Sequence, residues 1–307
     1  MKRLSILLAL ALLLSACSMP APPTLPQPDA SPAASVPPET IADPSPEAQE
    51  TFPMTFRQTL ADTEDCTAEV TAIGLDGAGN WVFHLRMENR AAEIQNFAFL
   101  YQSINGLSCE SLLYRLAVGE SVEREFRVLR EALSAFGETR EVQWSFTLQV
   151  SSAESNRENY FDERCFVCPA GESEPLRYQY RPGADDVTVM DNDYAAVYVT
   201  GVSREGEGLA VDFVAVNRTD APLRLLLPPW EQCSANGRSI AGELCDDIAP
   251  ESTLVGYIPL TGDALSLLGR VEELRFMLLL TDPEEAPDEE LEGSSVWVTL
   301  RPDLDLN

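Results

Sequence analysis

The sequence predicts a mainly β chain that folds as two antiparallel β-sandwich domains in tandem. Three observations lead to this prediction: apolar residues alternate along short runs, turn signals separate the runs, and the pattern occurs twice. Alternation with period two is typical of a strand that buries one face. The short strands favour a sandwich, immunoglobulin-like in the broad sense, over a small barrel.

The repeat begins with a strand that ends in Asn-Arg in both copies. Residues 81–90 read WVFHLRMENR and residues 209–218 read LAVDFVAVNR. In the first copy the apolar side chains fall mainly on one face. In the second copy the other face is also rather apolar, so we expect that strand to be covered on both sides.

Three further elements follow in the same order in each copy. Asn105-Gly106 and Asn236-Gly237 predict hairpin turns, because both residue types tolerate positive φ. Residues 132–137 and 264–269 predict a short helical turn that ends at glycine. The alternating run 142–150 then answers 274–280. The distance along the chain from each element to its counterpart is nearly constant, which favours an internal duplication over chance similarity.

Residues 1–16 are expected to be a signal peptide. Lys2 and Arg3 precede an apolar run, residues 4–14, that is too short to span a bilayer comfortably. Residues 14–17, Leu-Ser-Ala-Cys, then resemble the lipobox of bacterial lipoproteins. This resemblance implies that Cys17 becomes the lipidated first residue of the mature chain, with acyl groups such as palmitate as its anchor. The alternative is an ordinary cleaved signal with a coincidental cysteine.

The remaining chain divides by composition. Residues 17–52 carry the lipidated cysteine and a Pro-rich segment that favours an extended, disordered stalk. Residues 53–168 form the first expected domain, residues 169–189 a polar linker, and residues 190–303 the second domain. The runs 66–73 and 195–202 are expected as further strands, and the acidic stretch 283–290 as a hairpin loop.

Charge limits the partners of the protein. Fifty acidic residues against 21 Lys and Arg give a formal net charge of −29, and Lys2 is the only lysine. Nucleic acids and anionic membrane surfaces select basic patches, so this balance argues against both. It suits solubility at a crowded surface, or a cationic partner.

Six cysteines follow Cys17, and an even number outside the cytoplasm suggests disulfides. Cys233 with Cys245 is the first choice, because the Asn236-Gly237 turn lies between them. Cys66 and Cys109 would pair with each other or with the remaining two, Cys165 and Cys168.

The Cys165-x-x-Cys168 motif resembles a thioredoxin-type redox motif and half of a structural zinc site. It lies where the repeat predicts a last strand, opposite residues 296–300. Positions i and i+3 of a strand point to opposite faces about 10 Å apart, farther than a disulfide spans. We therefore expect neither redox catalysis nor a metal site, and no cofactor.

Catalytic motifs are not evident. His84 is the only histidine and falls on the polar face of its strand, where a surface role is the expectation. Carboxylates are abundant, but nothing singles out a pair for glycoside hydrolysis. Asp185, Asp186 and the run 191–193 do not match the spacing of an EF-hand calcium loop. Trp81 and Trp144 fall on apolar strand faces, so we expect them to pack in the core. We expect Trp230 to be exposed.

The lipobox, the Pro-rich stalk and the tandem β repeats together resemble uncharacterised surface lipoproteins of Firmicutes-type bacteria. This resemblance implies a place on the extracytoplasmic face of the cell membrane and a fold, but no activity. We therefore expect a lipid-anchored, non-catalytic binding or scaffolding protein whose partner is an envelope protein, a peptide or a glycan. The alternative is a cell-envelope hydrolase, or an accessory subunit, that uses an Asp/Glu pair.

Overall fold

The computed structural model describes residues 56–130, 141–154, 159–171, 175–228, 231, 233–283 and 290–306. Residue contacts divide the chain into Met1–Gln49 and Glu50–Asn307, and all described residues lie in the second unit. Cys17, the expected leader and the whole of the expected stalk therefore lie outside the described residues. No helix in the described ranges is long and apolar enough to cross a membrane.

The described chain is mainly β, which confirms the predicted fold class. It contains 21 strands and one helix, the four-residue α1 (Asp263–Ser266), in those ranges. Helix α1 forms the second of the two expected helical turns. The first, residues 132–137, lies outside the described residues.

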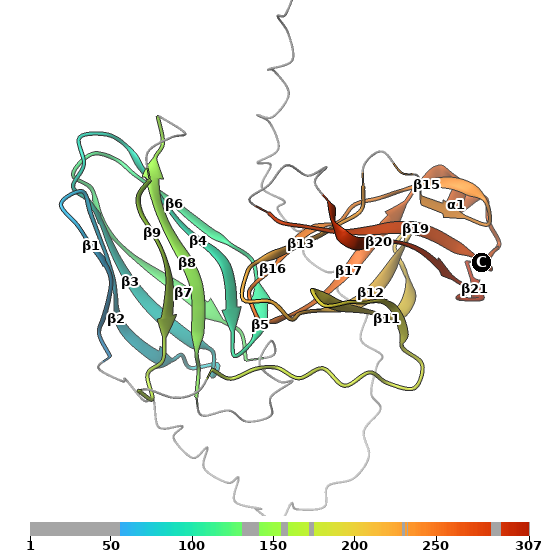
Figure 1. Ribbon diagram of the computed structural model, residues 1–307, viewed down its shortest axis with the longest axis horizontal. Coiled ribbons are helices and arrows are strands. Elements are labelled where there is room, and N and C mark those ends of the chain that lie inside the picture. Colours follow the sequence, from blue (N-terminus) through green and yellow to red (C-terminus); the bar gives the residue numbers. More distant parts are fainter. Residues whose placement is uncertain are drawn as a thin grey trace, which may run out of the picture. The chain divides into compact units, whose positions relative to one another are not determined.

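The first half of the described chain forms two layers around one core (Figure 1). One layer is antiparallel and has the order β1 (Gln58–Asp62), β2 (Cys66–Leu75), β3 (Trp81–Asn89), β7 (Ser121–Val128). The other contains β6 (Leu112–Leu116), β4 (Gln95–Ile104), β8 (Trp144–Ser152) and β9 (Asn159–Val167), with β5 (Leu107–Cys109) paired to β4.

Aromatic side chains fill the first core. Trp144 is fully buried, and its ring lies 5.1 Å from that of Phe83 and 5.6 Å from that of Phe99. Trp81 is 7% exposed. Core packing of Trp81 and Trp144 is therefore confirmed, whereas Trp230 lies outside the described residues.

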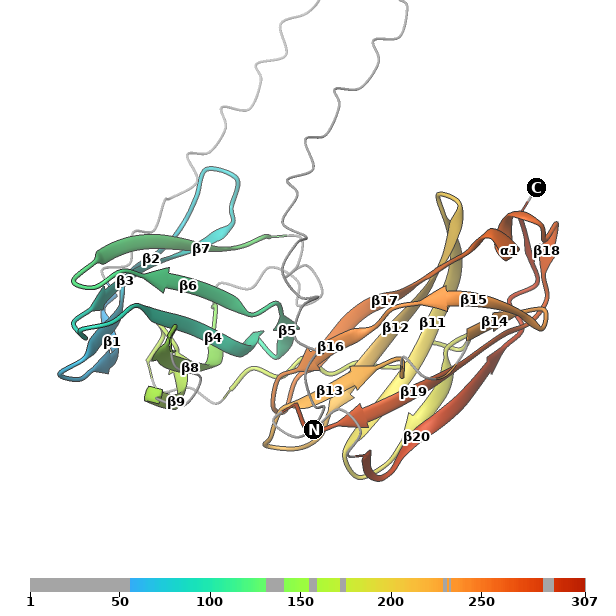
Figure 2. The same cartoon turned by 90° about the horizontal axis from the view of Figure 1, so that it is seen from above.

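The second half also has two layers around its own core (Figure 2). One layer is β10 (Val187–Asp191), β11 (Ala195–Glu205), β12 (Gly208–Asn217), β17 (Thr253–Thr261). The other contains β16 (Cys245–Ile248), β13 (Leu223–Leu226), β19 (Leu274–Thr281) and β20 (Glu290–Leu300). The hairpin β14 (Cys233–Ala235) and β15 (Arg238–Gly242) joins the layers, and β18 (Arg270–Val271) pairs with β21 (Leu304–Asp305).

The predicted repeat elements occupy matching places in the two halves. The order β1-β2-β3-β7 corresponds to β10-β11-β12-β17, and each Asn-Arg lies at the end of the third strand. The expected hairpin turns are also present, with φ of 51° at Asn105 and 80° at Gly106. The two halves have corresponding strand orders, but this does not establish their common origin. Descent by internal duplication therefore stays a prediction.

The second copy of the repeat strand buries residues on both faces, as expected. Val211 and Phe213 belong to the core, and Val214 on the opposite face is 4% exposed.

The segment before β10 contacts this layer: Thr253 Oγ1 donates to the backbone oxygen of Tyr178 over 3.3 Å, and the Tyr180 and Tyr198 rings lie 5.4 Å apart. The expected linker is thus packed along part of its length, and β10 begins within its predicted range at Val187.

Candidate ligand-binding cavity

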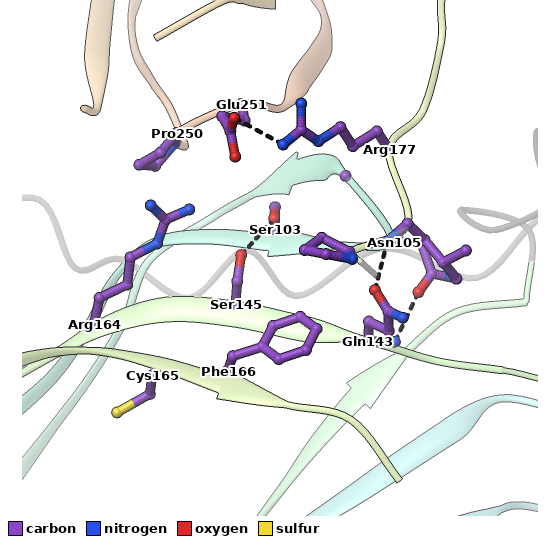
Figure 3. Close-up of a pocket in the computed structure, with 13 residues that line it drawn as sticks. Ser103, Asn105, Gln143, Ser145, Arg164, Cys165, Phe166, Arg177, Pro250 and Glu251 are labelled. Atoms are coloured by element: carbon purple, nitrogen blue, oxygen red, sulfur yellow. Dashed lines mark hydrogen bonds and ion pairs between the residues drawn. The ribbon is translucent and has the colours of Figure 1, made fainter. Parts of the chain in front are cut away.

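A cavity of about 380 Å³ lies beside the Asn105-Gly106 turn (Figure 3). Residues from β4, β8 and β9 form one side of it. The turn that contains Pro250 and Glu251, together with the segment Pro175–Arg177, lines the rest. Side chains distant in sequence therefore converge at this one place.

Strand register explains how the polar side chains come together. Ser145 pairs with Ser103 on β4 and with Phe166 on β9, and cross-strand partners share a face of the sheet. The two serine Oγ atoms lie 2.8 Å apart, within hydrogen-bonding distance. Just before Ser103, β4 contains a β-bulge at which Tyr101 has a φ of 48°. Bulges of this kind change the direction of nearby side chains.

Buried amides hold the segment 175–177 against the cavity. The backbone N–H of Gln143 donates to Asn105 Oδ1 over 2.7 Å, and Asn105 Nδ2 donates to the backbone oxygen of Glu141 over 3.2 Å. The N–H of Leu176 donates to Gln143 Oε1 over 2.6 Å. These contacts engage both amide oxygens within the protein, so they shape the cavity rather than offer acceptors to a ligand.

The cavity carries one ion pair and one further guanidinium. Arg177 Nη2 lies 2.8 Å from Glu251 Oε1. Arg164 donates from Nη1 to the backbone oxygen of Asp220 over 3.4 Å, a long and weak contact. The lining therefore has an excess of positive charge in a chain whose formal net charge is −29.

Cys165 lies beside the cavity on β9, but its side chain packs in the first core, and its environment opposes nucleophilic chemistry. Burial raises the pKa of the Cys165 thiol to about 11. Reactive cysteines instead have lowered pKa values, because the thiolate is the nucleophile. Cys165 is therefore not an activated nucleophile.

All six described cysteines are free thiols in the structure. Cys233 packs in the second core, whereas Cys245 is exposed on β16. Cys66 and Cys165 are buried, and Cys109 and Cys168 are partly buried. The expected pairings stay predictions. In the part of the chain described, no three Cys, His, Asp or Glu side chains are grouped so that they could hold a metal ion.

A carboxylate cluster that sequence reasoning missed lies on β16. Asp246 has a raised pKa, first because partial burial disfavours its charged form and then because Asp247 and Glu110 are close. Asp247 is engaged by Arg224, whose Nε and Nη2 lie 2.7 and 3.2 Å from its carboxylate oxygens. Glu110 belongs to the first half of the chain and Asp246 to the second, so no local pattern could have paired them.

The other singled-out residues have ordinary surroundings. His84 Nδ1 lies 3.8 Å from Glu125 on the outer face of β3 and β7, as a surface role predicts. Tyr180 donates from its hydroxyl to Asp186, and Arg218 pairs with Asp191 over 2.7 Å. These contacts involve Asp186 and Asp191, two of the carboxylates whose spacing was compared with that of a calcium-binding loop.

Comparisons with known proteins do not assign the chain to a family. No family model matches it, and no curated protein matches it. Among solved structures, red sea bream transglutaminase aligns with 9% identity and a TM-score of 0.22 over 80% of this chain and 31% of the transglutaminase, so the match spans about a third of that protein. The N-terminal periplasmic domain of ScsB from Proteus mirabilis aligns with 12% identity and a TM-score of 0.22, over 80% of this chain and 97% of that domain.

Proposed function

We propose that this protein is a lipid-anchored binding or scaffolding lipoprotein on the extracytoplasmic face of the bacterial membrane, and that it binds without catalysis. The observation that supports binding is the cavity beside the Asn105-Gly106 turn. Its wall carries the Arg164 guanidinium, the hydroxyl pair of Ser103 and Ser145, and the exposed ring of Phe166. Strands β4, β8 and β9 hold all four of these side chains, and binding sites are often concave surfaces with a few placed polar groups.

The lipobox supports the membrane address. We expect wild-type chain to label with an alkyne palmitate analogue and to sediment with membranes. Cys17→Ala should lose the label and leave the membrane fraction, because acyl chains supply the anchor. Cys245→Ala is the matched control, since its thiol is also exposed but lies in the folded part. Label and sedimentation that survive Cys17→Ala would refute the anchor.

Site-specific photo-crosslinking on living cells tests binding. Benzoylphenylalanine at position 166 places the reactive group at the cavity, because Phe166 is 37% exposed there. The control position is Leu267, which is 72% exposed and absent from the cavity lining. A recurrent envelope protein, peptide or glycan captured only from position 166 would support the proposal. Identical capture patterns at both positions, or no capture from folded protein at either, would count against it.

The carboxylate cluster favours one alternative, a cell-envelope hydrolase or accessory subunit that uses an Asp/Glu pair. A carboxyl group with a raised pKa is typical of a general acid, and Asp246 has that property. Hydrolysis of cell-wall glycans by the purified protein, abolished by Asp246→Asn and kept by Asp185→Asn, would establish this alternative. Full hydrolysis by the Asp246→Asn variant would exclude it.

A further inference from the structure

We infer that the cavity beside the Asn105-Gly106 turn is a site for a small organic carboxylate with an apolar group. This inference rests on the proposed binding function and names the ligand class. It follows from the hydrogen-bonding groups that the cavity leaves available, from its charge and from its one aromatic wall.

The Ser103–Ser145 pair has one hydroxyl hydrogen that can be donated to a ligand. Each hydroxyl carries one hydrogen, and the Ser103–Ser145 contact at 2.8 Å uses only one of the two. The structure gives the remaining hydrogen no acceptor among the described residues. Either hydroxyl can be the donor in this contact; Ser103 is 6% exposed and Ser145 is partly buried, so the remaining hydrogen lies at the cavity wall. A ligand oxygen at the cavity wall would satisfy this donor.

Arg164 adds further donors and a charge. A guanidinium has five N–H groups, and Arg164 uses one of them in its 3.4 Å contact with Asp220. The forked geometry of the remaining groups suits the two oxygens of a carboxylate. By contrast, the carboxylate of Glu251 is engaged by Arg177, and the Asn105 and Gln143 oxygens accept backbone hydrogens. Donors thus exceed acceptors, and the cavity favours a ligand rich in acceptors.

The apolar part of the lining distinguishes an organic carboxylate from phosphate. Phe166 follows Arg164 by two positions on β9, so both side chains lie on the same face of the strand. Pro250 and Leu176 line the cavity as well. An anion held by Arg164 can therefore extend an apolar group over the Phe166 ring, which inorganic phosphate lacks.

Titration of the purified full chain with 3-phenylpropanoate, butanoate and N-acetylleucine tests the inference by ligand-observed NMR and calorimetry. We expect at least one of the three to bind with a Kd below about 1 mM. The neutral 3-phenylpropanamide and inorganic phosphate should bind at least about 10-fold more weakly than that carboxylate.

Arg164→Gln should weaken carboxylate binding about 10-fold or more, and Ser103→Ala with Ser145→Ala about 3-fold to 10-fold. Arg238→Gln is the matched control, because Arg238 is exposed at the other hairpin turn and absent from the cavity lining. Equal binding of acid and amide, preference for phosphate, unchanged binding by folded Arg164→Gln, or no binding of any carboxylate up to about 10 mM would each overturn the inference. The crosslinking experiment reads out partner capture separately, so failure here leaves the proposed binding function standing.

Discussion

Asn89 and Asn217, one in each half of the protein, make the same set of hydrogen bonds. Nδ2 of Asn89 donates to the backbone oxygens of Glu93, Leu116 and Ala117 over 2.8, 3.1 and 3.0 Å. Nδ2 of Asn217 donates to the equivalent oxygens of Ala221, Ile248 and Ala249 over 2.8, 3.2 and 3.0 Å. Each asparagine thereby ties the end of its strand to the end of a strand in the opposite layer, β6 in the first half and β16 in the second.

The neighbouring arginines are also equivalent. Arg90 Nη1 lies 3.1 Å from Asp62 at the end of β1, and Arg218 Nη1 lies 2.7 Å from Asp191 at the end of β10. The repeated Asn-Arg dipeptide therefore has a structural role in each half. Its asparagine joins the layers, and its arginine holds the end of the first strand.

Asn89→Ala and Asn217→Ala should each lower the free energy of unfolding by about 2–4 kcal/mol, because buried carbonyl groups would lose their donor. Asn89 is fully buried and Asn217 is 2% exposed. Asn96→Ala is the matched control, since Asn96 is only partly buried on β4, and we expect it to cost below about 1 kcal/mol. Urea unfolding measures the three values. Equal costs for Asn89→Ala and Asn96→Ala would show that the network contributes nothing specific.

The two Asn-Gly turns provide a second matched pair. A Cβ at Gly106 would lie 2.6 Å from the backbone nitrogen of Tyr178 and 2.9 Å from the Cα of Arg177, whereas a Cβ at Gly237 would meet nothing within 4 Å. Both glycines have positive φ, 80° and 74°. Both alanine variants therefore carry the conformational cost of about 1 kcal/mol, but only Gly106→Ala must also displace the packed linker.

Limited trypsin digestion distinguishes these variants. Gly106→Ala should expose the bond after Arg177 and speed its cleavage several-fold, since displaced backbone is cleaved more readily. Gly237→Ala should leave cleavage there at the wild-type rate. Equal rates in the two variants would mean that the Gly106 contact does not hold the linker.

Sequence periodicity predicted the long strands and the turns because these depend on local pattern. The runs 81–89, 144–150 and 209–217 became β3, part of β8 and β12, and Asn105-Gly106 and Asn236-Gly237 adopted positive φ. The short strands β1 and β10 were missed. They pair with β2 and β11 across bulges, which interrupt simple alternation.

The cavity was missed for a different reason. Ser103, Ser145 and Arg164 are unexceptional in sequence, and strand register brings them together. Pairing the 142–150 run with the predicted last strand would have brought these runs together, but the register that sets Ser145 opposite Phe166 comes from the structure. No local signal would have added Leu176 or Glu251, whose contribution depends on where a polar linker and a turn distant in sequence pack.

The carboxylate cluster predicts a pH dependence of stability. The pKa of Asp246 is raised above its ordinary value of 3.8, so the folded state binds this proton more tightly than the unfolded state. The contribution of Asp246 to stability is fully present below pH 3.8 and is lost as the pH rises through the folded-state pKa. Above its folded-state pKa the ionised, partly buried carboxylate is therefore destabilising.

Asp246→Asn should accordingly raise Tm by about 1–3 °C at pH 7 and by less at pH 3, where the wild-type carboxyl is already protonated. Glu110→Gln should give a smaller gain, because Glu110 is the smallest of the three causes of the shift. Asp247→Asn should instead lower Tm, since it removes the negative charge and one of the two oxygens that accept from Arg224. Calorimetry at the two pH values measures all three, and a Tm gain for Asp246→Asn that is as large at pH 3 would contradict the electrostatic cause.

The cysteines give a last prediction, which also tests the expected disulfides. In reduced, folded chain we expect Cys245 to react fastest with a thiol-specific disulfide reagent, because it is the exposed cysteine among those described. Burial raises the pKa of Cys109 to about 12 and that of Cys165 to about 11, so few of these thiols ionise at pH 8 and both should react slowly. Mass spectrometry after timed alkylation assigns each rate. The same measurement without reductant tests the Cys233–Cys245 pairing: if that bond forms, both residues stay unmodified until reductant is added, and Cys233 must move from the second core toward the surface.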